Sequence, residues 1–136
     1  MSTTTPPHPS VGRIIVAILF AALSFNALNE VLDMLRGESD GPPALLVLQT
    51  LCGVTAAATA WGAWRGARWS AALATLYGLI AAGMVVSLGP MLDMPVEERG
   101  GLWIGGGVIL LFAVGCAWSL RRSTRSVRAD ATEEVR

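Results

Sequence analysis

The sequence predicts an all-α integral membrane protein: a four-helix bundle that crosses the membrane four times, with both termini in the cytoplasm. Three observations lead to this prediction. Hydrophobic residues make up 53% of the 136 residues and charged residues only 15%, whereas a soluble domain carries about 25% charged residues. Four apolar runs are each long enough for a membrane-spanning helix, which takes about 20 residues. The basic residues gather at alternate ends of these runs.

The first span is expected over residues 11–35, after a polar, proline-rich segment at residues 1–10. That segment has too little apolar surface to offset its ordering entropy, so we expect a disordered tail. Its His8 has no ligand-forming neighbour and is expected to be solvated. An alternative interpretation makes the first run a signal peptide, with Arg13 in its charged region and a cleavage site at residues 22–24. Three spans of unchanged orientation would then remain.

The other spans of the transmembrane domain, which covers residues 11–120, are expected at residues 44–64, 69–88 and 101–120. Pro42 and Pro43 suit the first turn of the second helix, where an amide hydrogen would have no partner. Gly89 and Pro90 are expected to stop the third helix. The tail at residues 121–136 is basic, then acidic, and is expected to be cytoplasmic and without regular structure. No run alternates like a strand, and open sheets do not span lipid.

The arginines predict the orientation. Cytoplasmic segments carry an excess of Arg and Lys, and with four spans both termini share one side with the link at residues 65–68. Eight arginines lie on that side and two on the other: Arg13, Arg65, Arg68, Arg121, Arg122, Arg125, Arg128 and Arg136 against Arg36 and Arg99. Tryptophans favour both interfaces, and all five stand at span ends: Trp61, Trp64, Trp69 and Trp118 inside, and Trp103 outside.

The predicted location is the bacterial cytoplasmic (inner) membrane, as a multi-pass protein whose first partner is the lipid bilayer. All ten basic residues are arginine and none is lysine. Arginine codons are GC-rich and lysine codons AT-rich, so we interpret the bias as a sign of a GC-rich bacterial genome. The net charge is zero, so no overall field attracts nucleic acid, and we expect no nucleic-acid partner.

One polar face stands out in the last third of the first span. Asn26, Asn29, Glu30 and Asp33 are spaced i, i+3, i+4 and i+7, which places them on one side of a helix. Gln49 enters from the same side of the membrane on the second helix, at a depth that allows a hydrogen bond to Asn26 or Glu30. These five residues form the candidate polar pocket.

Two interpretations of this face remain open. In the first interpretation, the face forms a pocket that binds a cation, a proton or a ligand, because ionisable groups inside a membrane face protein or water. Alternatively, the helix projects from the membrane and its acids lie at headgroup level. We prefer the second interpretation, because Glu30 and Asp33 are near the end of the span. No catalytic motif, metal-ligand cluster or cofactor-binding motif is present, and Cys52 and Cys116 are expected to be free thiols inside apolar runs.

Small residues four positions apart are expected to let the helices approach closely; the pairs are Gly53 and Ala57, Gly78 and Ala82, and Gly101 and Gly105. The link at residues 62–69, GAWRGARW, resembles the one between the second and third spans of uncharacterised four-span bacterial membrane proteins. Size and layout are similar to those of DoxX-like proteins. The carboxylate in the first span also resembles that of small multidrug transporters, although Glu30 stands near the outer end and the arginine bias is stronger.

From these features we expect a non-enzymatic protein, an accessory or scaffold subunit that packs against itself or a larger membrane complex. One alternative is a small transporter or ion-coupled carrier that uses Glu30 and Asp33. Another is a redox accessory protein that handles quinone. The transporter requires Glu30 inside a cavity, whereas the scaffold requires filled helix interfaces and an exposed face of small residues.

Overall fold

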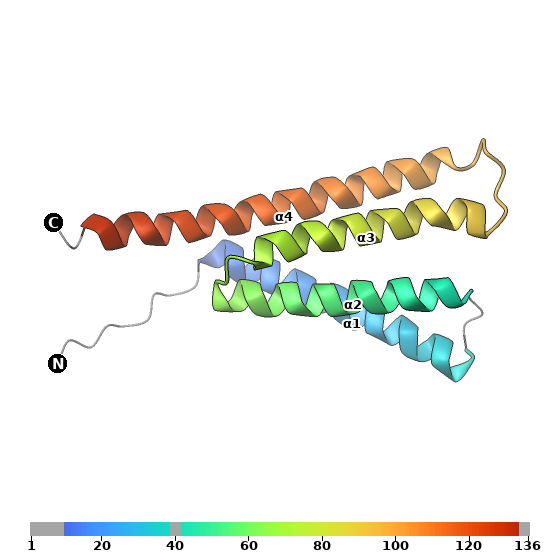
Figure 1. The fold of residues 1–136 in the computed structure, drawn as a ribbon, viewed down its shortest axis with the longest axis horizontal. Coiled ribbons are helices and arrows are strands. Elements are labelled where there is room, and N and C mark those ends of the chain that lie inside the picture. Colours follow the sequence, from blue (N-terminus) through green and yellow to red (C-terminus); the bar gives the residue numbers. More distant parts are fainter. Residues whose placement is uncertain (1–9, 39–41, 134–136) are drawn as a thin grey trace.

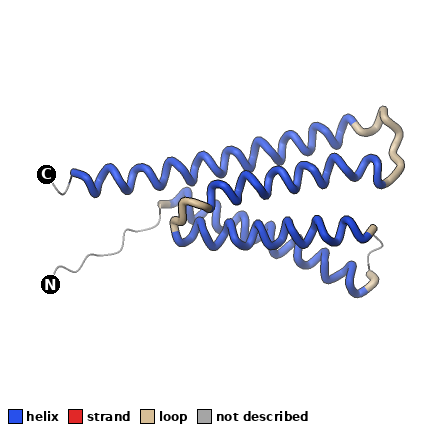
Figure 2. Tube along the Cα trace, viewed as in Figure 1, coloured by secondary structure: helices blue, strands red, loops and turns tan. Residues whose placement is uncertain are grey.

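The computed structural model describes residues 10–38 and 42–133. Within these residues the chain is all-α, as expected, and consists of α1 (Val11–Arg36), α2 (Pro43–Arg65), α3 (Ser70–Met91) and α4 (Gly100–Glu133). The helices run antiparallel along one long axis, and the loops lie at its ends (Figures 1 and 2). Each helix contains a stretch long and apolar enough to cross a membrane, which characterises a multi-pass membrane protein. Residues 1–9 of the expected N-terminal tail lie outside the described part.

The helices turn small side chains inward and large apolar side chains outward. Only 22–28% of each apolar stretch is buried, and nine of the sixteen buried apolar residues in the described chain are alanine. Phe25 and Leu111 point outward with 75% and 74% of their surface exposed. Such a surface suits lipid, whose tails are as apolar as leucine, and an alanine-rich interior lets helix backbones approach closely.

Close approach between neighbouring helices depends on glycine. In the α1–α2 interface, the Ser24 hydroxyl donates a hydrogen bond of 2.9 Å to the carbonyl of Gly53, and a methyl group added to Gly53 would meet Leu28 at 3.0 Å. In the α3–α4 interface, Gly78 lies against the methyl group of Ala113. These two interfaces, together with a smaller one between α2 and α3, hold the bundle together, while α1 touches α4 over a short stretch.

The third expected small-residue pair does not form such an interface. A methyl group added to Gly101 would meet no described atom within 4 Å, and at Gly105 its nearest contact is an ordinary 3.7 Å. The close contact is one position further along, where the same methyl on Gly106 would lie 3.3 Å from the carbonyl oxygen of Ala82. Because neighbouring helix positions are about 100° apart, the side of α4 that meets α3 is the Gly106 side.

Two helices extend further than expected. α3 passes Pro90, in its last turn, and ends where Asp93 takes a left-handed conformation with φ 50°. The Met94 amide then donates to the Gly89 carbonyl at 3.0 Å, which satisfies a terminal acceptor. α4 continues to Glu133, so the expectation of an irregular tail from residue 121 is wrong over most of its length. No glycine or proline follows Gly115, so the sequence contains no strong helix breaker there.

Arg13 connects the beginning of α1 to the end of α2. Its Nε donates to the carbonyl oxygen of Ala63 and its Nη2 to that of Trp64, both at 3.1 Å. These carbonyls belong to the last turn of α2, where acceptors have no partner within the regular helix and a positive charge is favourable. The link after α2 begins at Gly66, whose left-handed conformation has φ 70°.

Gly66→Ala is expected to destabilise the protein more than Gly37→Ala. Both glycines end a helix with a positive φ, 70° and 74°, so each alanine costs about 1–2 kcal/mol. At Gly66 the new methyl also meets the Arg13 guanidinium, whereas at Gly37 no described atom lies within 4 Å. The measurement is the midpoint of chemical unfolding in detergent. Equal losses for the two variants would mean that the Arg13 contact contributes nothing to stability.

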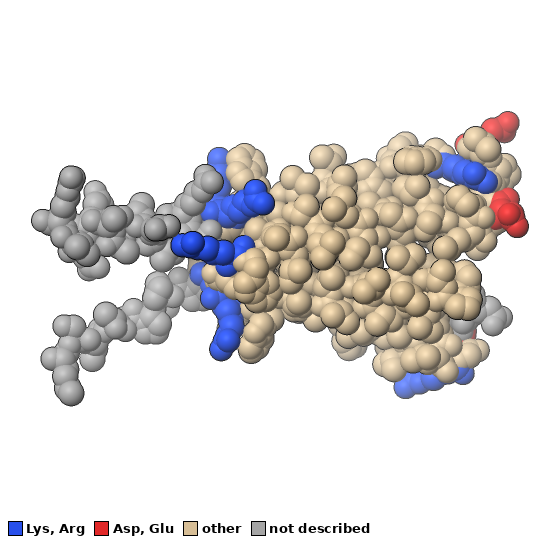
Figure 3. Space-filling view, viewed as in Figure 1, with Lys and Arg blue, Asp and Glu red and all other residues tan. Residues whose placement is uncertain are grey.

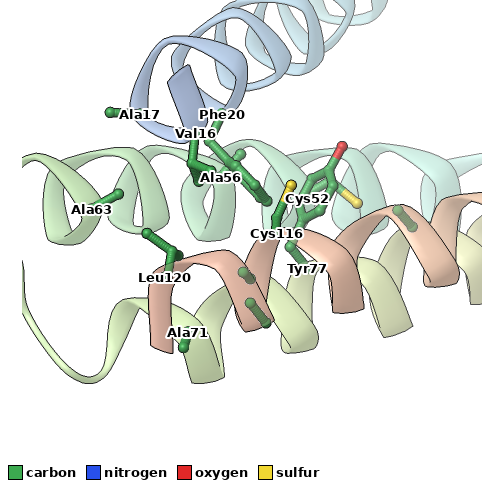
Figure 4. Packing of buried hydrophobic residues seen from close by; sticks show 13 residues of the cluster. Val16, Ala17, Phe20, Cys52, Ala56, Ala63, Ala71, Tyr77, Cys116 and Leu120 are labelled. Atoms are coloured by element: carbon green, nitrogen blue, oxygen red, sulfur yellow. The ribbon is translucent and has the colours of Figure 1, made fainter. Parts of the chain in front are cut away.

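An aromatic pair and two thiols occupy the middle of the bundle. Phe20 and Tyr77 meet edge to face, with ring centroids 5.2 Å apart. Cys52 and Cys116 are buried beside them as free thiols (Figure 4). This cluster joins all four helices in one core, and it lies directly below the cavity described next.

Candidate ligand-binding cavity

A cavity of about 480 Å³ lies among the four helices in the half of the bundle that ends at Arg36 and Arg99. We call it the Glu30 cavity. Its walls come from α1 (Leu23, Asn26, Ala27, Glu30, Met34), α2 (Leu45, Gln49, Cys52), α3 (Tyr77, Ala81, Met84, Val85, Leu88) and α4 (Ile109, Phe112). Leu88 near its mouth and Tyr77 at its floor are separated by about 16 Å along α3. The cavity therefore reaches from the end of the bundle toward its middle.

The cavity exists because α1 does not follow the other helices along its whole length. α1 diverges from α3 and α4 toward the Arg36 end (Figure 1) and keeps its long interface with α2. The space between these two helix pairs is not closed by large side chains. Asn26 on α1 and Phe112 on α4 line it and are exposed, so the cavity opens on the side where α1 and α4 separate.

Polar groups occupy one wall, about halfway down. The Gln49 side-chain amide donates a hydrogen bond to the Glu30 carboxylate, with 3.3 Å between Nε2 and Oε2. Gln49 is only 7% exposed, so its amide holds the exposed Glu30 carboxylate from the protein side. Glu30 stands about 9 Å along the helix from Arg36 at the end of α1. No arginine lines the cavity, so the charge of Glu30 has no protein cation there.

Only three of the five candidate pocket residues come together. Asn26, Glu30 and Gln49 line the cavity, whereas Asn29 and Asp33 lie outside it. The Asn29 side-chain amide instead approaches the Asp33 carboxylate, 3.4 Å away and one turn further along α1. The reason is geometric: Asn29 precedes Glu30 by one residue and is rotated about 100° from it around the helix. The side of α1 that does line the cavity carries Leu23, Asn26, Ala27 and Glu30, the same spacing begun three residues earlier.

The apolar part of the site was not predicted. The cavity is also lined by Met34, Cys52, Tyr77 and Met84. In the sequence, nothing distinguishes these residues from other apolar residues of a membrane helix. The one available signal was depth: Cys52 lies one turn deeper than Gln49 on the same side of α2. The hydroxyl of Thr50, next to Gln49, does not reach α1 and donates to the Leu46 carbonyl of its own helix at 2.7 Å.

The two ends of the bundle differ in charge (Figure 3). Arg13, Arg65, Arg68, Arg121 and Arg122 lie at one end. The other end carries Glu38, Asp93, Glu97 and Glu98 together with Arg36 and Arg99, so acidic groups outnumber basic ones there. The Glu30 cavity lies in this half of the bundle, where the field favours cations over anions.

Among the described residues, no group of three or more His, Cys, Asp or Glu side chains comes together that could hold a metal ion. Glu30 accepts a hydrogen bond from the Gln49 amide, and most of the other side chains that line the cavity are apolar. The chain matches no known protein family, and no curated protein or solved structure is detectably similar to it.

Proposed function

We propose that the protein binds a small organic cation with an apolar body in the Glu30 cavity and carries it through the bacterial inner membrane. The observation that supports this function is a carboxylate without a protein cation in an otherwise mostly apolar cavity. Pockets for small molecules have volumes of about 300–1,000 Å³, apolar walls and a few placed polar groups. The 480 Å³ cavity with Glu30, Gln49 and Asn26 fits this description.

Electrostatics explains why the ligand should be a cation. A charged group within the membrane is costly unless it faces water or an opposite charge. When a ligand fills the cavity it displaces the water around Glu30, and only a positive charge on the ligand compensates for that loss. The apolar wall that includes Leu23 and Ile109 then accommodates the rest of the molecule.

Tetraphenylphosphonium, a lipophilic cation, tests this proposal against its anionic counterpart tetraphenylborate. In equilibrium dialysis with purified protein in detergent, we expect saturable binding of the cation, approaching one per chain, and much weaker binding of the anion. The two ions have similar shape and opposite charge, so the difference isolates the effect of ligand charge. Equal binding of both ions, or no saturable binding of the cation, would contradict the proposal.

A scaffold or accessory subunit is the second candidate, supported by an open glycine face on α4. Gly107 and Gly115 are exposed, and a methyl group on either would meet no described atom within 4 Å. Exposed small residues allow close contact with another helix in the membrane. This candidate predicts that the protein can be cross-linked into an assembly in native membranes. It also predicts no saturable cation binding by the purified protein, so the dialysis experiment distinguishes the two functions.

For the orientation, we propose that the arginine-rich end faces the cytoplasm. Eight of ten arginines belong to the three segments on that side, and an Arg and Lys excess marks cytoplasmic segments. The Glu30 cavity would then lie in the outer half of the membrane.

Reporter fusions along the chain provide the check on orientation. A reporter fused after Arg68 is expected to be active in the cytoplasm, and one fused after Asp40 outside it. The physical reason is the eight-to-two division of arginines between the two sides. A cytoplasmic signal after Asp40 would reverse the orientation and place the cavity in the inner half of the membrane.

A further inference from the structure

A second hollow lies on the outer surface of the bundle, between α1 and α2, in the half that ends at Arg13 and Arg65. Its volume is about 590 Å³, and we call it the Trp64 groove. Ala17, Ala21 and Ser24 of α1 and Ala57 and Ala60 of α2 form its base, and Trp61 and Trp64 form a wall. The Trp64 groove and the Glu30 cavity share no lining residue, although α1 and α2 contribute to both.

The groove faces away from the core. Trp61 and Trp64 are 58% and 59% exposed, and Ile18 and Phe25 beside them also point outward. The hydroxyl of Ser24, the polar side chain at the base, is already bonded to the Gly53 carbonyl. In a membrane, this surface meets hydrocarbon.

The dimensions match one lipid chain. From Ala17 to Leu28 the groove follows α1 for about 16 Å, and one leaflet of the hydrocarbon core is about 15 Å thick. Small residues form the base and large residues the walls, so an extended chain can lie against the helix backbones.

The end of the groove carries positive charge. Arg13 is one turn from Ala17 on the same side of α1, and its guanidinium is bonded to the Trp64 carbonyl. The Arg65 guanidinium lies over the Trp61 ring, 5.0 Å from its centroid, and Arg68 follows in the link. Every described acidic side chain belongs to the opposite half of the bundle (Figure 3). A phosphate at this end therefore meets arginines and no described carboxylate.

We propose that the Trp64 groove is a binding site for an anionic phospholipid, whose acyl chain lies along Ala21 and Ala57 while its phosphate contacts Arg13 and Arg65. The charge complementarity selects an anionic lipid over a zwitterionic one, because basic residues next to the membrane attract anionic headgroups. A second copy of the chain is the competing occupant, and it requires no particular lipid charge.

Quenching of the fluorescence of the two groove tryptophans, Trp61 and Trp64, by lipids with dibrominated chains tests the site. The full chain is reconstituted in phosphatidylcholine with Trp69, Trp103 and Trp118 replaced by phenylalanine. Brominated phosphatidylglycerol is expected to quench the groove tryptophans with an apparent association constant about fivefold higher than that of brominated phosphatidylcholine, the effect of about one arginine–headgroup contact. Arg65→Gln should reduce this preference and leave quenching by phosphatidylcholine in place.

Two adjacent alanines provide the matched control. Ala21→Phe fills the groove, whereas Ala22→Phe adds the same ring to an exposed position at nearly the same depth outside it. Ala21→Phe is expected to lower quenching by both lipids, and Ala22→Phe to leave it unchanged. Equal quenching by the two lipids in the parent protein, or equal effects of the two variants, would overturn the proposal. A third result would also overturn it: quenching by both lipids that is weak at first and increases when the protein is diluted in lipid. That result would mean that a second copy of the chain covers the groove until dilution separates the two.

Discussion

Replacing Glu30 by glutamine is expected to weaken binding of tetraphenylphosphonium by at least about tenfold, because close charge pairs contribute about 1.5 kcal/mol or more. Glutamine keeps the size of the side chain and can still pair with the Gln49 amide, which now lies 3.3 Å from the carboxylate. Only the charge is removed. Expression and unfolding midpoint should therefore remain near those of the parent protein, and dialysis should show the loss of binding alone.

Asp33→Asn is the control for this substitution. Asp33 is on the same helix, one turn closer to the end, and its carboxylate meets Asn29 and does not line the cavity. Its removal changes the net charge by the same amount as Glu30→Gln but leaves the cavity wall intact. We expect at most a small decrease in cation affinity. Equal losses for the two variants would mean that the general field of the acidic end attracts the ion, and the Glu30 cavity would not be the binding site.

The positions of the helices were predictable because lipid imposes one strong requirement, a run of about 20 apolar residues. The ends were less predictable. Gly37 and Gly66 follow the last residues of α1 and α2 in the left-handed conformation, a common way for a helix to end. The Gly89–Pro90 signal failed because Pro90 falls in the last turn of α3, where the missing amide hydrogen breaks a single bond. The extension of α4 to Glu133 is hard to predict because the sequence after residue 120 is polar, which is typical of a tail, and lacks the glycine or proline that would mark a helix end.

The cavity was only partly predictable, for a physical reason. Glu30 and Gln49 were identified because polar residues at matching depth on adjacent helices tend to meet. The apolar walls leave no comparable signal, since lipid and protein interior are equally apolar and neither side of a helix such as α3 is marked by polarity. The rotation of each helix about its own axis, which places Met84 and Phe112 in the cavity, comes from the close contacts of glycine and alanine.

Gly78→Ala is therefore expected to destabilise the bundle by about 1–3 kcal/mol, the usual range for overpacking. A methyl group on Gly78 would overlap the methyl of Ala113. Neither methyl has a rotamer that moves it away, so α3 and α4 must separate along their interface. The loss should appear as a lower midpoint of chemical unfolding in detergent. Because Tyr77 and Ala81 on either side of Gly78 line the Glu30 cavity, cation affinity should decrease as well.

Two further variants show whether the contact itself is responsible. Gly83→Ala adds the same methyl to the same helix, where no described atom lies within 4 Å, and alanine is the better helix former by about 1 kcal/mol. It should be neutral or stabilising. In the second variant, Ala113→Gly removes the opposing methyl in the Gly78→Ala background and is expected to restore part of the lost stability, although each of these single changes is destabilising alone. If the double variant is as unstable as the sum of its parts, the two residues do not interact, and the α3–α4 interface is not held by this contact.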